Sequence, residues 1–208
     1  MTTIYLIRHS KTLKVNNSLN TDDIQIQNEK KCLSLEGEEL AKKILNKDEF
    51  NNIDILYSSN YVRAIQTAKF LAHKNNLDIN IISDLGERKF GVNSWDELPS
   101  NFEIKQFLDE NYKIGNGESR KEVTERMYSV IENILKNNKN KRIAIVSHGT
   151  AIYFLLKKWC DIELEDEEKI KFTFNNKVIF DKKLDYCEIF KLIFDDNNLV
   201  NIENIRFE

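Results

Sequence analysis

The stretch TIYLIRHSKT, residues 3–12, runs a short apolar segment directly into a cation and an imidazole. Residues 4–7 are all apolar or aromatic, which is typical of a buried β-strand. Arg8 and His9 follow at once. Because a strand end is rigid and the loop after it lies at the surface, this position is suited to holding a reactive side chain. Arg8 and His9 are therefore the first candidate site residues.

Segments of strand length alternate with segments of helical periodicity along the rest of the chain. Strands are expected at 53–57, 79–82, 142–146, 187–194 and 199–205, and helices at 35–45, 61–73, 123–135 and 150–158. This alternation predicts an α/β fold, a three-layer α/β/α sandwich with a mostly parallel central sheet. No sequence repeat or Pro/Gly/Ser-rich linker divides the chain, so one domain is expected over residues 1–208.

The composition argues against several functional classes. The 208 residues are 41% hydrophobic and 31% charged, with a net charge of −3, which gives no electrostatic basis for binding nucleic acid or an anionic membrane. The apolar runs are far shorter than the roughly 20 residues of a membrane span, and no secretion signal is expected. Cys32, Cys160 and Cys187 lack metal-ligand spacing. A cytoplasmic protein is expected, and its oligomeric state is not predicted.

A second histidine stands where a later predicted strand ends. The stretch RIAIVSHGT, residues 142–150, places His148 and Gly149 directly after an apolar run. The carboxyl ends of neighbouring parallel strands meet at one edge of a sheet, where such folds place their sites. We therefore expect His9 and His148 to lie close together, although a single strand-end histidine is more often a structural residue.

An arginine follows another predicted strand. In YSSNYVRAIQTA, residues 57–68, Arg63 falls in the first turn of a predicted helix. A helix start favours anions, and a guanidinium matches phosphate oxygens with two parallel hydrogen bonds. Arg63 is expected to converge with Arg8 and His148 on one phosphate group, with His9 beneath it. Taken alone, Arg63 would be expected to pair with a surface carboxylate.

Six segments occur in an order that resembles the histidine phosphatase superfamily, also called phosphoglycerate mutase-like proteins. They are LIRHSKT (6–12), LSLEGEELA (33–41), YSSNYVRAIQTA (57–68), LGERKFG (85–91), GNGES (115–119) followed by Arg126, and VSHGTAI (146–152). Two positions depart from the family pattern. Ser10 stands where a glycine is common, and the asparagine that many members carry six residues after the first histidine falls on Val15, with Asn16 one step late.

The resemblance implies a phosphoglycerate mutase-like fold and a set of roles. His9 would be the nucleophile that forms a phosphohistidine, and Arg8, Arg63 and His148 would hold the phosphoryl group. Glu87 would be the acid that protonates the leaving oxygen and then the base that activates water. Further substrate contacts are predicted at Thr12 and Gly149. No cofactor and no metal are expected, because the sequence has no HExxH, no paired DxD and no Cys/His cluster.

A lid insertion is predicted around residues 92–117. Residues 92–114 contain five acidic and two basic side chains, which suits a multiply anionic ligand poorly. This favours a phosphatase acting on a small phosphomonoester; a cofactor-dependent phosphoglycerate mutase and a non-catalytic phosphate-binding module on the same fold are the alternatives. The lid aromatics would stack on a leaving group or pack the lid: Trp95, Phe102, Phe107 and Tyr112. Outside the lid, His73 is expected at the surface, and residues 161–169 as a solvated acidic helix or loop.

Overall fold

The central sheet of the molecule has six strands. A computed structural model describes residues 1–14, 23–164 and 169–206. The strand order is β3-β2-β4-β1-β8-β9. The strands are β1 (Thr2–Arg8), β2 (Ile55–Ser58), β3 (Ile79–Ile81), β4 (Arg142–Ser147), β8 (Ile189–Asp195) and β9 (Asn198–Ile205). The strands β3, β2, β4 and β1 are parallel to one another. Strand β8 pairs antiparallel with β1, and β9 pairs antiparallel with β8. The predicted α/β class with a mostly parallel sheet is confirmed.

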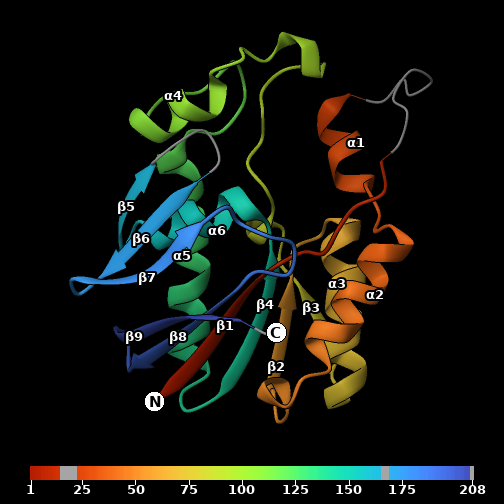
Figure 1. Cartoon of the computed structure of the whole chain (residues 1–208), viewed down its shortest axis with the longest axis vertical. Helices are drawn as coiled ribbons and strands as arrows, with labels where there is room; N and C mark the ends of the chain where they lie inside the picture. Colours follow the sequence, from red (N-terminus) through yellow and green to blue (C-terminus); the bar gives the residue numbers. More distant parts are fainter. Residues whose placement is uncertain (15–22, 165–168, 207–208) are drawn as a thin grey trace.

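Helices cover both faces of this sheet (Figure 1). One face carries α2 (Leu35–Leu45) and α3 (Val62–Asn75), and the other carries α5 (Arg120–Asn137) and α6 (Gly149–Leu156). Successive side chains of a strand point to opposite faces. Ile4 and Leu6 therefore pack with α5 and α6, whereas Tyr5 and Ile7 pack with α2 and α3. The uninterrupted apolar run of β1 follows from its burial on both faces.

A second sheet was missed by the sequence analysis. It is antiparallel and consists of β5 (Asp161–Leu164), β6 (Ile170–Phe174) and β7 (Lys177–Lys182). The expectation of a helix or loop over 161–169 was wrong for its first four residues, and residues 165–168 lie outside the described ranges. The sheet buries Phe172 and Phe180 against Phe190 of β8, with ring centroids 5.1–5.5 Å apart. Burial of these rings on one face stabilises strands whose other face is polar.

Two segments lie beyond the carboxyl ends of the parallel strands (Figure 1). One is residues 92–117, with the short 3₁₀ turn η4 (Trp95–Glu97) and α4 (Phe102–Leu108), and the other includes α1 (Ile24–Lys30). Two further 3₁₀ turns are η2 (Asp48–Phe50) and η3 (Ser83–Leu85). Phe102 is buried against the rings of Phe90 and Tyr112. Phe102 therefore packs within the 92–117 segment, which is one of the two roles considered for the lid aromatics.

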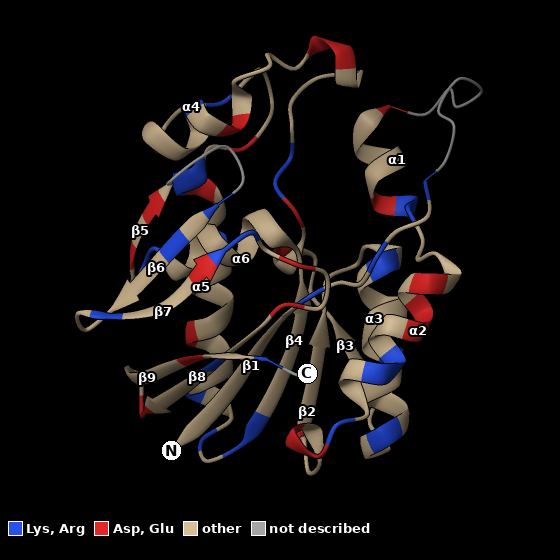
Figure 2. Ribbon diagram, viewed as in Figure 1, with Lys and Arg blue, Asp and Glu red and all other residues tan. Residues whose placement is uncertain are grey.

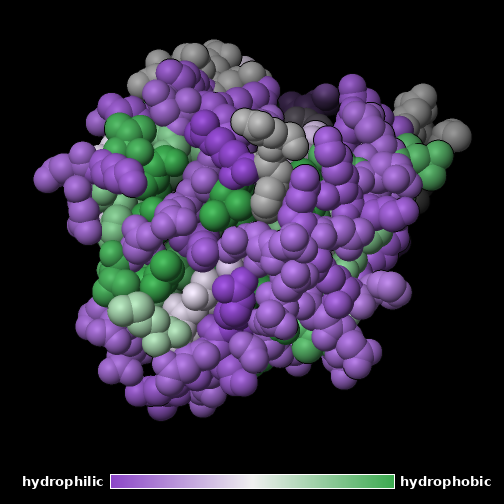
Figure 3. All heavy atoms as spheres, turned by 60° about the horizontal axis from the view of Figure 1, so that its bottom comes forward, coloured by the Kyte–Doolittle hydropathy of each residue, from purple (hydrophilic) through white to green (hydrophobic). Residues whose placement is uncertain are grey.

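The surface is mixed in charge and mainly polar. Figure 2 shows Lys and Arg interspersed with Asp and Glu over the described ribbon. On the face shown in Figure 3, hydrophobic residues gather on the side that carries β5–β9 in Figure 1, and hydrophilic residues predominate elsewhere. Within the described ranges, every helix is too short or too polar to cross a membrane. His73 is exposed on α3, as expected.

Candidate active site

Strand pairing brings the two histidines together. Arg8 of β1 and Ser147 of β4 are partners in the parallel register, and the backbone N–H of His9 donates to the carbonyl of Ser147 over 2.9 Å. His9 directly follows β1 and His148 directly follows β4, and the centroids of their rings lie 5.1 Å apart. Both side chains are buried, with 7% and 0% exposure. The predicted juxtaposition of His9 and His148 is present.

Arg63 lies between the two imidazoles. Its Nε donates to Nε2 of His9 over 3.0 Å, and its Nη2 lies 3.0 Å from Nδ1 of His148. Its Nη1 donates to the carbonyl of Asn28 in α1. Arg63 is 4% exposed and belongs to the first turn of α3. This is the placement that the sequence predicts, except that Arg63 contacts the histidines directly.

These contacts fix the tautomer of each histidine. Nδ1 of His9 lies 2.8 Å from the carbonyl oxygen of Ser10, so Nδ1 carries the proton and donates. Nε2 of His9 then presents its lone pair to Arg63. For His148 the assignment is reversed, because Nδ1 accepts from Arg63 and Nε2 donates to Oγ of Ser59 over 2.7 Å. A guanidinium has no acceptor, so only the neutral imidazoles satisfy both contacts.

Burial and positive charge favour these neutral forms. Burial lowers the pKa of His9 well below its ordinary value of 6.5, and the Arg63 guanidinium lowers it further, with a smaller effect from Arg8. Burial and the charge of Arg63 likewise lower the pKa of His148 well below 6.5. Desolvation disfavours a cationic imidazole, and neighbouring cations add repulsion. Both rings are therefore neutral at physiological pH.

Arg8 lies at the edge of a cavity. Its Nη1 donates to the carbonyl of Leu184 over 2.6 Å, and its guanidinium stacks on Tyr186 with 4.8 Å to the ring centroid. Its buried Nε has no partner among the described residues. A Cβ on Gly149 would lie 3.2 Å from that Nε, so a larger residue at 149 would crowd the Arg8 guanidinium. Arg8 and Gly149, both predicted substrate contacts, are adjacent.

Glu87 contacts the start of α6. Its Oε1 accepts from the backbone N–H of Ala151 over 3.1 Å, and its Oε2 from that of Thr150 over 3.3 Å. The N-terminus of a helix offers free N–H groups and a positive dipole end, which hold a carboxylate. Because His148 is the N-cap residue of α6, this contact fixes Glu87 relative to the second histidine. The acid candidate is thus placed at the same edge of the sheet.

Arg126 holds the backbone that carries Glu87. Its guanidinium donates to the carbonyls of Asp84, Gly86 and Glu87 over 2.6–3.2 Å. It is also ion-paired with Glu118 at 2.7 Å. A planar guanidinium with several donors is well suited to such multiple contacts. Arg126 therefore fixes the backbone position of Glu87.

Thr12 is placed in a structural bridge. Thr12 pairs with Leu33 in an isolated antiparallel bridge. The loop before it is held by Ser10, whose Oγ donates to the carbonyl of Gly37 over 2.7 Å and whose N–H donates to Oγ1 of Thr67 over 3.0 Å. Thr12 does not line the cavity beside Arg8. Val15 and Asn16 lie outside the described residues.

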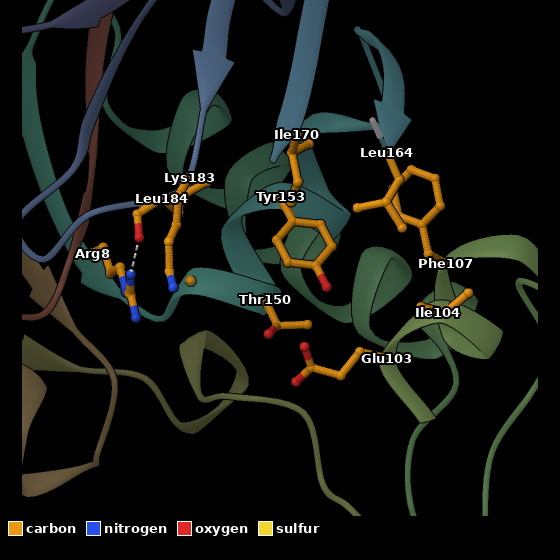
Figure 4. Close-up of a pocket in the computed structure, with 11 residues that line it drawn as sticks. Arg8, Glu103, Ile104, Phe107, Thr150, Tyr153, Leu164, Ile170, Lys183 and Leu184 are labelled. Atoms are coloured by element: carbon orange, nitrogen blue, oxygen red, sulfur yellow. Dashed lines mark hydrogen bonds between the residues drawn. The ribbon is translucent and has the colours of Figure 1, made fainter. Parts of the chain in front are cut away.

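A cavity of about 280 Å³ opens beside Arg8 and Gly149 (Figure 4). Its lining residues come from β1, α4, α6, the second sheet and the segment before β8: Arg8, Glu103, Ile104, Phe107, Gly149, Thr150, Tyr153, Leu164, Ile170, Lys183 and Leu184. Glu87 lines a separate cavity of about 190 Å³ with Tyr61 and Arg126. His9 lines neither of the two, and its Nε2 accepts from Arg63. Sequence reasoning missed Glu103, Tyr153 and Lys183, which belong to no motif. Ser59 falls within a quoted motif, but its contact with His148 was not predicted.

Donors for a metal ion are sparse in this region. Over the part of the chain that the structure describes, no group of three or more His, Cys, Asp or Glu side chains is arranged to hold a metal. Cationic side chains are present instead: Arg63 is hydrogen-bonded to His9, and the charges of Arg63 and Arg8 both act on its imidazole. This arrangement is suited to binding a phosphate dianion and attacking its phosphorus with a neutral imidazole.

Known proteins share this sequence pattern and this fold. The model of the histidine phosphatase superfamily (branch 1) matches residues 4–186. The uncharacterized phosphatase PhoE of Bacillus subtilis is 28% identical over 163 residues, covering 75% of this chain and 76% of that protein. The probable phosphoglycerate mutase GpmB of Erwinia tasmaniensis is 28% identical over 178 residues, covering 82% and 80%.

Solved structures confirm the fold at lower identity. A phosphoserine phosphatase from Entamoeba histolytica, in complex with 3-phosphoglyceric acid, superimposes with a TM-score of 0.67 at 22% identity, covering 99% of this chain and 98% of that one. A mycobacterial glucosyl-3-phosphoglycerate phosphatase gives a TM-score of 0.69 at 15% identity, with coverage of 99% and 98%. The chain therefore belongs to branch 1 of the histidine phosphatase superfamily and is a phosphatase enzyme of that family.

Proposed function

We propose that this protein is a metal-independent phosphomonoester hydrolase that acts on a small phosphorylated metabolite through a phosphohistidine intermediate. The observation that carries the proposal is the state of His9. Its Nδ1 proton is committed to Ser10 and its Nε2 lone pair is directed at the Arg63 guanidinium, 3.0 Å away. A neutral, oriented imidazole beside two arginines is what nucleophilic attack on a phosphate ester requires.

In the first step, the phosphoryl group of the substrate binds between Arg8 and Arg63. Arg63 turns its N–H groups from the imidazole to the phosphate oxygens, which frees Nε2 of His9. Nε2 attacks phosphorus and the bond from phosphorus to the ester oxygen breaks. Glu87, in its acid form, donates a proton to that oxygen, and the alcohol leaves.

In the second step, Glu87 acts as a base and takes a proton from water. The resulting hydroxide attacks phosphorus, the bond to Nε2 breaks, and inorganic phosphate leaves with His9 neutral again. The cations Arg8 and Arg63, and His148 through its contact with Arg63, stabilise the charge on the phosphoryl oxygens in both steps. The position of Glu87 against α6 supports the base role, because the N–H groups there hold it as a carboxylate close to the N-cap residue His148. The acid role is carried over from the family resemblance.

Residues 92–117 are proposed to form a lid over the cavity beside Arg8, within a single domain of residues 1–208. Ile104 and Phe107 of α4 contribute to the lining of that cavity. Exclusion of water by such a segment strengthens the electrostatic contacts beneath it. The alcohol part of the substrate would occupy this cavity, next to the phosphoryl group on Arg8. Thr12 and Gly149 remain proposed substrate contacts, Gly149 with more support because it lines the cavity.

The relatives named as probable phosphoglycerate mutases make that reaction the competing candidate. A mutase has to anchor a second phosphate and a carboxylate beyond the transferred phosphoryl group. The α4 side of the cavity presents Glu103, a carboxylate that disfavours such anions. The phosphatase is therefore the better supported function. Three free cysteines agree with action in the cytoplasm, and the mixed surface charge agrees with a small-molecule partner rather than nucleic acid.

The test is hydrolysis of 4-nitrophenyl phosphate in excess chelator from pH 5 to 8. We expect turnover by the wild type, none by His9→Ala, and wild-type rates for His73→Ala, which changes an exposed histidine on α3. Acid quenching of the wild type should trap a phosphohistidine. Equal rates in wild type and His9→Ala would remove His9 as the nucleophile. Absence of turnover in both would contradict the phosphatase and leave the mutase and the non-catalytic phosphate-binding module. Isomerisation of phosphoglycerate with added bisphosphoglycerate then distinguishes these two.

A further inference from the structure

Glu103 is a carboxylate in the cavity beside Arg8 that a buried arginine holds in place. Its Oε1 accepts from Nη2 of Arg88 over 2.6 Å. The Glu103 side chain is 72% exposed, whereas that of Arg88 is only 2% exposed. An exposed glutamate normally samples several rotamers, and a pair of exposed charges contributes little to stability. Here one partner is fixed, so Glu103 is held at the rim of the cavity.

Arg88 is itself clamped between two aromatic rings. Its guanidinium carbon lies 5.0 Å from the ring centroid of Phe90 and 5.2 Å from that of Phe102 in α4. Two of its nitrogens, Nε and Nη1, have no hydrogen-bond partner among the described residues. A buried donor without an acceptor is destabilising. Arg88 is thus a poor choice for stability alone. Among the described residues, its guanidinium donates to the carboxylate of Glu103, which lines the cavity.

The polar groups of the cavity are divided by charge. Figure 4 shows Arg8 and Lys183 on one side, and Glu103 on the other, toward α4. The tips of Thr150 and Tyr153 point to the same part of the cavity as the Glu103 carboxylate. Burial raises the pKa of Tyr153 to about 12, so its phenol is a neutral hydrogen-bonding group there. The phosphoryl group is drawn to the cationic side, and the far end of the alcohol meets a carboxylate and two hydroxyl groups.

We propose that the cavity selects phosphomonoesters whose alcohol carries an ammonium group, that is, phosphorylated amino alcohols, hydroxy-amino acids included. Glu103 is the specificity-determining residue and binds the ammonium by a charge-assisted hydrogen bond. Arg88 is a positioning residue that holds Glu103. The inference rests on the proposed function, because it assumes that the phosphoryl group binds at Arg8 and His9.

The test compares O-phosphoethanolamine with propyl phosphate, which has a methyl group in place of the ammonium. For the wild type we expect kcat/KM to be higher for O-phosphoethanolamine by about tenfold or more, the size of one hydrogen bond to a charged group. Glu103→Gln keeps the shape and the acceptor for Arg88, and should lower this ratio by about tenfold. Asp96→Asn changes an exposed carboxylate in the same 92–117 segment, outside the cavity, and should leave the ratio unchanged.

Arg88→Met tests the positioning role. The expected result is the same fall in the substrate ratio as for Glu103→Gln, which a purely structural residue would not produce. Thermal unfolding of Arg88→Met is measured in parallel, and Glu103→Gln carries the test if that variant does not fold.

Two controls separate this inference from the proposed function. Hydrolysis of 4-nitrophenyl phosphate reports the chemistry without the ammonium. If it is hydrolysed and the two alkyl phosphates react equally in wild type and Glu103→Gln, the ammonium selection is wrong and the phosphatase stands. If no ester is hydrolysed, the proposed function fails, and calorimetric binding of the two alkyl phosphates to His9→Ala decides on the cavity alone. Tighter binding of O-phosphoethanolamine there supports the inference, and equal binding overturns it.

Discussion

Nε of Arg63 donates to Nε2 of His9 over 3.0 Å, so the proposed nucleophile and a proposed phosphate ligand are each other's partners before substrate arrives. The contact keeps the buried imidazole neutral and gives its lone pair a direction. It also means that phosphate competes with His9 for the guanidinium. Binding and activation of the nucleophile would then be one event, since the phosphate that draws Arg63 away uncovers Nε2.

Replacement of Arg63 by lysine should separate charge from geometry. An ammonium keeps the positive charge but cannot contact His9, His148 and the carbonyl of Asn28 with one planar group. We expect kcat/KM for 4-nitrophenyl phosphate to fall by about 10²-fold or more, the loss typical of a preorganised donor to a developing charge. Arg206→Lys, near the end of the described chain, is the matched control and should retain wild-type activity.

Arg63→Met should in addition raise the pKa of His9. The Arg63 charge is the second cause, after burial, of the low pKa of that imidazole. The change is measured by NMR titration of the histidine ring resonances. An unchanged His9 pKa would show that the two side chains do not interact in solution.

Replacement of Glu87 by glutamine should affect poor leaving groups most. The amide oxygen can still accept from the N–H of Thr150 or from that of Ala151, so one of the two contacts with the start of α6 is kept. The amide cannot donate a proton to the leaving oxygen. We expect alkyl phosphate hydrolysis to slow by about 10²–10⁴-fold. The loss for 4-nitrophenyl phosphate should be smaller, because nitrophenolate leaves without protonation.

The comparison of the two esters is the decisive measurement for Glu87. Asp84→Asn, an exposed carboxylate three residues earlier, serves as the control. Equal losses for alkyl and aryl esters in Glu87→Gln would contradict general acid catalysis and would leave Glu87 as a helix-capping residue.

Arg126 should act on the reaction through Glu87. Its contacts to the carbonyls of Asp84, Gly86 and Glu87 fix the backbone that carries the acid. Arg126→Lys loses most of these contacts, and we expect kcat for an alkyl phosphate to fall with little change in KM. The loss should again be larger for the alkyl than for the aryl ester. A uniform loss for both esters together with a lowered melting temperature would indicate a role in stability only.

The sequence predicted those parts of the molecule that a short stretch of neighbouring residues specifies. The apolar run before Arg8 and the motif around Arg63 each specify a strand end or a helix start within a few residues. The carboxyl ends of neighbouring parallel strands meet at one edge of a sheet, and the pairing of β1 with β4 in the structure places His9 beside His148. These residues were predicted because one element and its immediate neighbour position each of them.

The cavity was not predictable in the same way. Glu103 belongs to α4, Tyr153 to α6 and Lys183 to the segment before β8, so the lining depends on contacts between elements that are distant in sequence. The second sheet was missed for a related reason. The alternation of Asp161, Ile162, Glu163 and Leu164 is a strand pattern, but it is short and its acidic residues suggested a solvated segment. Its stability comes from Phe172 and Phe180 packing on Phe190, which no local pattern shows.

The stability of the fold should depend on pH through the two buried histidines. The pKa of His9 and that of His148 are both lowered well below 6.5 in the folded protein. In the unfolded chain both rings take up a proton near pH 6.5, whereas in the folded chain they stay neutral. The unfolded state then binds more protons, so the free energy of unfolding falls as the pH drops below about 6.5. Above that value the contribution of both rings is fully present.

The slope is limited to about 1.4 kcal/mol per pH unit for each histidine. Urea unfolding at pH 7, 6 and 5 measures this slope. The pKa values of the carboxylates Glu49 and Asp54 are lowered, so these groups affect stability only at more acidic pH. His9→Gln and His148→Gln should each remove part of the slope, whatever they do to stability at pH 7. His73→Gln, which changes an exposed ring, should leave the slope unchanged. A wild-type slope in His9→Gln would mean that His9 takes up its proton as readily in the folded chain as in the unfolded one. The lone pair of Nε2 would then not be reserved for Arg63 and for phosphorus.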